Sequence, residues 1–125
     1  MPRALSLALL AAALCAAAPP AFARPAATIP APFRGIWNGT VLPCSPSASD
    51  DTRLELTARR VNFYESGGTV SRVTRVDART IRIVGRLSGE GETFTARYPF
   101  RLSADGRQLT DITQPEHFVR HRCRG

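Results

Sequence analysis

Arginine is the residue type in this chain best suited to recognising another molecule. All 17 basic side chains are arginines, against ten acidic residues, and the formal net charge is +7. A guanidinium group presents a planar fork of N–H donors that pairs with both oxygens of a phosphate or carboxylate. Several arginines on one surface would therefore bind an anion. Six of them fall in three predicted neighbouring strands: Arg72, Arg75, Arg82, Arg86, Arg97 and Arg101.

The other candidate groups do not form a recognisable catalytic motif. The chain has no G-x-S-x-G nucleophile motif, and the segment Gly89–Gly91 lacks the later glycine of a dinucleotide-binding loop because Phe94 stands there. Glu90 and Glu92 fall in a predicted turn, where carboxylates are ordinarily solvated, so we do not assign them with Glu65 as an acid–base set. We predict a protein that is not an enzyme and needs no cofactor.

Two of the three cysteines predict a disulfide. Cys15 lies in a segment that we expect to be removed, which leaves Cys44 and Cys123 as an even pair. In an oxidising compartment this pair is most simply a disulfide, closing a loop of about 80 residues. A metal site is the alternative, but His117 and His121 follow a strand-like alternation and would lie about 13 Å apart, too far for one ion. We therefore predict the disulfide and no metal.

Residues 1–23 have the order of a secretory signal peptide. A basic residue, Arg3, precedes an almost unbroken Leu/Ala run, and the A-x-A pattern at 21–23 predicts cleavage after it. The run is short for a membrane span, although an uncleaved anchor is the alternative. Leu14 is too bulky for lipoprotein processing at Cys15. We expect a periplasmic or secreted protein with no stable membrane span after cleavage.

The elements that must position the arginines are strands. From Phe33 onward, short apolar alternations are separated by turn residues about every ten positions, and no helix-period run competes with them. The strongest alternation is Phe94–Leu102, with apolar side chains at even positions. We predict one all-β domain over residues 33–125. An extended Pro/Ala leader at 24–32 precedes it and contributes nothing to a core.

The turn signals predict how these strands are connected. Gly67 and Gly68 are the strongest hairpin signal, because adjacent glycines readily adopt the positive φ angles of a primed turn. Short turns of this kind produce a small antiparallel up-and-down meander of about seven or eight strands. A disulfide between its first and last parts favours closure into a barrel or barrel-like sandwich. In that fold the six arginines converge on one outer surface.

Several stretches resemble known families: Phe33–Trp37, Phe63–Ser66, Gly89–Phe94 and the final Arg122-Cys123. Together they are similar to an uncharacterised family of small exported bacterial proteins, which implies no known activity. A weaker resemblance is to the lipocalin and calycin barrels, whose first strand carries G-x-W and whose last strand carries an arginine packed across the tryptophan. Trp37 and either Arg120 or Arg122 match those positions, and the resemblance implies that they close one end of a barrel.

Three functional hypotheses follow. The leading one is an exported barrel whose arginine face binds an anionic envelope component or an acidic protein, although the codon use of a GC-rich genome also favours arginine over lysine. The second is a hydrolase inhibitor with a projecting hairpin at Ser66–Thr69, a segment similar to a loop of the periplasmic inhibitors of c-type lysozyme. The third is a lipocalin-like carrier of a small apolar ligand. We do not expect nucleic acid as a partner, because the few aromatic side chains are mostly assigned inward.

Overall fold

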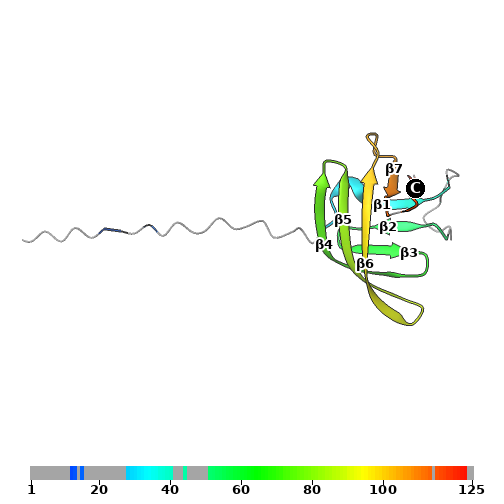
Figure 1. Ribbon diagram of the computed structural model, residues 1–125, viewed down its shortest axis with the longest axis horizontal. Helices are drawn as coiled ribbons and strands as arrows, with labels where there is room; N and C mark the ends of the chain where they lie inside the picture. Colours follow the sequence, from blue (N-terminus) through cyan, green and yellow to red (C-terminus); the bar gives the residue numbers. More distant parts are fainter. Residues whose placement is uncertain are drawn as a thin grey trace, which may run out of the picture.

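Eight antiparallel strands of this chain close into a barrel in which each strand is hydrogen-bonded to the next and β8 returns to β1 (Figure 1). The computed structural model describes residues 12–13, 15, 28–40, 44, 51–113 and 115–123. The strands are β1 (Gly35–Asn38), β2 (Leu54–Leu56), β3 (Arg60–Phe63), β4 (Gly67–Asp77), β5 (Thr80–Gly89), β6 (Glu92–Leu102), β7 (Gln108–Asp111) and β8 (Phe118–Arg122). The predicted all-β meander is confirmed, and it closes fully.

The long strands β4 to β6 separate an apolar interior from a basic exterior. In β5, Ile81, Ile83 and Leu87 are fully buried, whereas Arg82 and Arg86 between them are exposed. Successive side chains of a strand point to opposite faces, so the apolar residues fill the barrel and the arginines remain outside. The alternation of the sequence therefore determines which side chains can meet on the outer surface.

Gly67 and Gly68 lie in β4 and not in a turn, so the predicted hairpin position is wrong. Gly68 pairs with Val61 of β3, and the chain reverses direction at residues 64–66. A Cβ atom at Gly68 would overlap the backbone carbonyl oxygen of Arg86 in β5. Glycine is needed here because two backbones approach closely, which the sequence signal does not distinguish from a turn.

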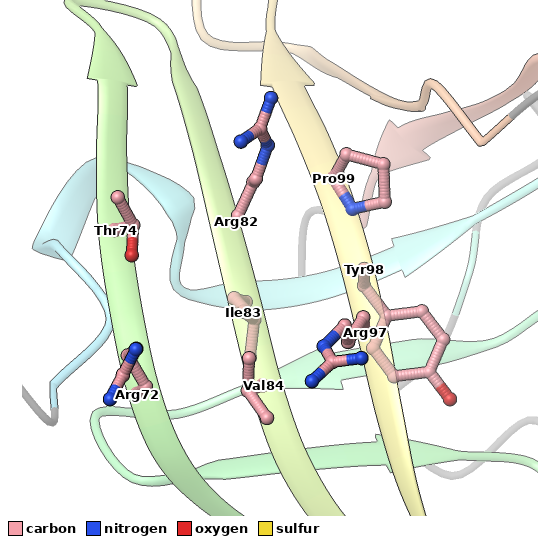
Figure 2. Close-up of a pocket in the computed structure, with 8 residues that line it drawn as sticks. All are labelled: Arg72, Thr74, Arg82, Ile83, Val84, Arg97, Tyr98 and Pro99. Carbon is pink, nitrogen blue, oxygen red and sulfur yellow. The ribbon is translucent and has the colours of Figure 1, made fainter.

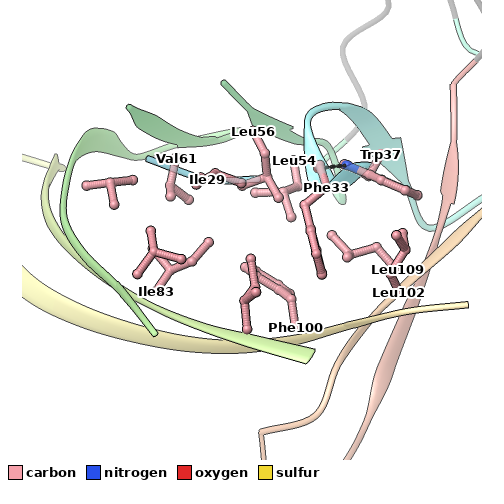
Figure 3. Close-up of a cluster of buried hydrophobic side chains, with 13 residues drawn as sticks. Ile29, Phe33, Trp37, Leu54, Leu56, Val61, Ile83, Phe100, Leu102 and Leu109 are labelled. Carbon is pink, nitrogen blue, oxygen red and sulfur yellow. Dashed lines mark hydrogen bonds between the residues drawn. The ribbon is translucent and has the colours of Figure 1, made fainter. Parts of the chain in front are cut away.

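Residues before β1 close one end of the barrel, which we call the capped end. Ile29 is fully buried, and Phe33 ends a single turn of 3-10 helix, η1 (Ala31–Phe33). Figure 3 shows both side chains in the core cluster with Trp37, whose ring N–H donates to the Phe33 carbonyl oxygen at 3.0 Å. The prediction that residues 24–32 contribute nothing to the core is therefore wrong for Ile29. A single apolar residue between prolines has no periodicity that would reveal its burial.

The contact between β1 and β8 closes the barrel. It includes the pair Trp37 and Arg122, and it is continued by a hydrogen bond of 2.8 Å from the Cys123 backbone N–H to the Ile36 carbonyl oxygen. The predicted disulfide is confirmed: it joins Cys123 to Cys44, 79 residues away, with a Cα–Cα distance of 5.3 Å. In the part of the chain that the structure describes, we find no helix with the length and hydropathy needed to cross a membrane.

Candidate functional site

A depression on the outer face of β4, β5 and β6 brings together three of the predicted arginines. Arg72 pairs with Val84, and Val84 pairs with Arg97, so these side chains form one row across the three strands. Arg82 lies two residues earlier on the same face of β5 (Figure 2). The depression has a volume of about 410 Å³ and is lined by Arg72, Thr74, Arg82, Ile83, Val84, Arg97, Tyr98 and Pro99.

The three guanidinium groups of this depression have no partner among the described residues. Arg72, Arg82 and Arg97 are all exposed, and none of them makes an ion pair or a side-chain hydrogen bond with that part of the chain. Val84 and Pro99 line the same depression and supply apolar surface. Because no carboxylate of the described residues neutralises these cations, the depression has the electrostatic character of an anion site.

The other three predicted arginines are placed differently. Arg86 and Arg101 lie on the outer face, where each makes a long hydrogen bond to a threonine hydroxyl, at 3.5 and 3.4 Å. Arg75 pairs with Ile81, whose side chain is buried in the barrel, so it lies on the opposite face of β4 from Arg72. The structure thus places five of the six arginines on one face. Arg72 and Arg75 are three residues apart in a stretch of β4 that pairs continuously with β5, so their side chains point to opposite faces.

Arg122 is the arginine that packs on Trp37. Its guanidinium carbon lies 4.1 Å from the centroid of the Trp37 ring. Its three nitrogens donate to backbone carbonyl oxygens at 2.7 to 3.0 Å, those of Pro32, Arg34 and Gly106. The sequence left Arg120 and Arg122 as alternatives for this pairing, and the structure places Arg122 there. The side chain thereby connects β8 to η1 and to the β6–β7 turn.

Arg120 has different surroundings although it is two residues earlier on β8. It is 9% exposed, and its Nε donates to the Thr52 carbonyl oxygen at 2.8 Å. The guanidinium carbon lies 4.6 Å from the ring centroid of Phe118 and 5.7 Å from that of Phe63. Its Nη1 is buried and has no hydrogen-bond partner in the part of the chain that the structure describes. Burial lowers the pKa of Arg120, and the nearby Asp111 carboxylate opposes that shift.

Aromatic side chains extend inward from this region. The ring centroids of Phe63 and Tyr98 are 4.9 Å apart, and those of Tyr98 and Phe100 are 5.8 Å apart. Burial raises the pKa of Tyr98, and the Asp111 carboxylate raises it further, while Arg120 acts in the other direction. Sequence reasoning did not select these side chains as a site. The sequence does contain a signal, because polar residues stand at strand positions that share a face with core residues. This signal can be recognised only when the pairing register between the strands is known.

Three glutamates that we did not assign as a catalytic set nevertheless lie together. Glu65, Glu90 and Glu92 line a depression of about 220 Å³ with Phe94, between the β3–β4 and β5–β6 turns. The neighbouring segment Ser66–Thr69 does not project as the inhibitor hypothesis requires, because its last three residues belong to β4. Among the residues with described positions, no group of three His, Cys, Asp or Glu side chains could hold a metal ion.

Comparisons of the chain with models of known protein families, with curated proteins and with solved structures give no match.

Proposed function

We propose that this chain is an exported, non-enzymatic β-barrel protein that binds an anionic component of the cell envelope through the outer face of β4 to β6. The observation that carries the proposal is the set of three guanidinium groups, those of Arg72, Arg82 and Arg97, around one depression of about 410 Å³. They have no carboxylate partner among the described residues. The fold thus places three positive charges around one depression, where an external anion can neutralise them.

The chemistry of the depression favours a ligand that carries phosphate or carboxylate groups next to apolar atoms. Guanidinium groups bind such anions with two parallel hydrogen bonds each, and Val84 and Pro99 offer apolar contact between them. An envelope partner agrees with the disulfide, since disulfides persist in oxidising compartments outside the cytoplasm. The signal peptide and the resemblance to small exported bacterial proteins remain predictions that point the same way.

The test compares two variants with the same loss of charge. In the first, Arg72, Arg82 and Arg97 are each changed to Gln. In the matched control, three exposed arginines in turns at the capped end are changed instead: Arg59→Gln, Arg79→Gln and Arg107→Gln. Binding is measured on lipopolysaccharide, which offers phosphates, on peptidoglycan, which offers carboxylates, and on neutral lipid vesicles, at increasing salt.

We expect the first variant to lose about tenfold or more in affinity for one of the anionic materials, and the control to lose much less. Salt should weaken binding by the wild-type protein, because mobile ions screen exposed charges over about 10 Å at 0.1 M. Equal losses in the two variants would show that net charge alone, and not the depression, determines binding. Affinity that does not change with salt, or equal binding to neutral vesicles, would also contradict the proposal.

A further inference from the structure

The barrel interior near the start of β8 contains a buried cation that the described residues do not neutralise. Arg120 is 9% exposed, and no ion pair joins it to any described carboxylate. Asp111 is the acidic group that acts on it through space, yet one of its oxygens accepts hydrogen bonds from the Thr113 backbone N–H and hydroxyl. Arg120 therefore keeps a donor, Nη1, that is away from solvent and that no described residue satisfies.

Such a donor is costly unless an acceptor is present. A buried polar group without a hydrogen-bond partner destabilises a protein, and more strongly when it is charged. The Nε of the same side chain is held by the Thr52 carbonyl oxygen, so the guanidinium group is fixed in position. A group held in this way is already organised to receive an acceptor from outside the chain.

The surroundings of this donor are aromatic and partly uncovered. The Phe63 and Phe118 rings flank the guanidinium carbon, and the Tyr98 ring packs against Phe63 at a tilt of 50°. Phe118 is 41% exposed and Phe63 is half-buried, whereas the core residues toward the capped end, such as Phe100 and Leu109, are almost fully buried. A ligand can thus contact the rings from the end opposite η1, and the filled core restricts it to a small size.

We infer that the interior around Arg120 binds a small molecule with a carboxylate on a flat apolar body. The carboxylate accepts a hydrogen bond from Nη1 and neutralises the guanidinium charge, which is the combination that makes such bonds strong. The apolar body lies against the Phe63 and Phe118 rings, where flat groups pack favourably. This site is separate from the depression on the outer face of β4 to β6 and does not depend on its function.

Phenylacetate is a suitable probe because it combines one carboxylate with one small ring, and phenethyl alcohol is its uncharged counterpart. Titration of each into the purified wild-type protein is followed by calorimetry and by the NMR signals of the arginine Nε–Hε groups and the phenylalanine rings. We expect saturable binding of phenylacetate, with shifts at Arg120, Phe63 and Phe118, and weaker binding of phenethyl alcohol.

Variants then locate the site. Arg120→Met removes the charge and the donor while keeping much of the volume, and Arg120→Lys keeps the charge. Arg59→Met, at an exposed residue in the β2–β3 turn, is the control for loss of one arginine. We expect Arg120→Met to weaken phenylacetate binding about tenfold or more, Arg120→Lys to retain part of it, and Arg59→Met to change it less than about twofold.

The inference fails if phenylacetate leaves the Arg120 signals unmoved, or if Arg120→Met and Arg59→Met bind it equally. The wild-type spectra decide the matter even if Arg120→Met does not fold. The outer-face variant of Arg72, Arg82 and Arg97 should bind phenylacetate normally, so failure at one site is distinguishable from failure at the other.

Discussion

Arg120 and Arg122 are two residues apart on β8, and each places its guanidinium group over an aromatic ring inside the barrel. Among the described residues, Arg122 donates to three backbone carbonyl oxygens, whereas Arg120 donates to one and keeps a buried nitrogen without a partner. The difference lies in the neighbours: η1 and the β6–β7 turn present carbonyl groups at the capped end, and side-chain rings surround Arg120. The donating nitrogens of Arg122 are thus used within the fold, whereas Arg120, two residues away, keeps a donor that no described residue satisfies.

The largest effect on stability should come from removing the disulfide of Cys123, the residue that follows Arg122. Changing both Cys44 and Cys123 to Ser removes a cross-link over 79 residues, worth about 4–5 kcal/mol by the chain-entropy estimate. We expect the thermal midpoint to fall by more than about 10 °C. Calorimetry measures it, and reduced wild-type protein should match the variant. An unchanged midpoint would show that the capped end is stable without the bond.

Arg122→Met should be the most damaging of the single arginine changes. It removes the contact with the Trp37 ring and leaves three carbonyl oxygens without their donor. Hydrogen bonds to charged groups contribute about 1.5–3 kcal/mol each and do not add fully, so we expect a loss of about 3 kcal/mol in the free energy of unfolding. Urea denaturation measures this loss, and Arg59→Met provides a surface control.

Arg120→Met should change the free energy of unfolding by less than about 1 kcal/mol, or raise it. The substitution loses one hydrogen bond to Thr52 but also removes a buried donor without a partner, and replacing such groups by apolar ones is often neutral or stabilising. The same urea experiment applies. If Arg120→Met and Arg122→Met destabilise equally, Arg120 is also structural, and the contrast between the two positions disappears.

The smallest effect concerns the turn that supports Arg122. A hydrogen bond from the Ser103 hydroxyl and another from the Arg107 backbone N–H lower the pKa of Asp105. Because the folded pKa lies below the unfolded one, this contribution is present above about pH 4 and is lost as the pH falls through the folded value. Asp105→Asn should therefore lower the thermal midpoint slightly at neutral pH and flatten its decline in acid, and midpoints measured from pH 6 downward test this. An unchanged acid profile would contradict it.

The outer arginine face could be predicted from the sequence, whereas the environment of Arg120 could not. Once Ile81–Leu87 is recognised as a strand, the period of two determines that Arg82 and Arg86 point outward. Distinguishing Arg120 from Arg122 requires knowing which one lies opposite Trp37, and this depends on the register between the first and last strands. Arg75 was misplaced on the outer face although it lies three residues after Arg72 in a regularly paired part of β4, where the period of two already places the two side chains on opposite faces.

The contact between β1 and β8 has a consequence for solubility. A strand with unpaired backbone groups is a template on which a second chain can add, and such growth leads to aggregates. Closure removes both free edges of this eight-stranded sheet. The pairing between β1 and β8 is short, however, and hydrogen bonds made by Arg122 and Cys123 beside it stabilise the junction. Substitutions that weaken this junction should therefore promote amyloid-like assembly well before they abolish folding.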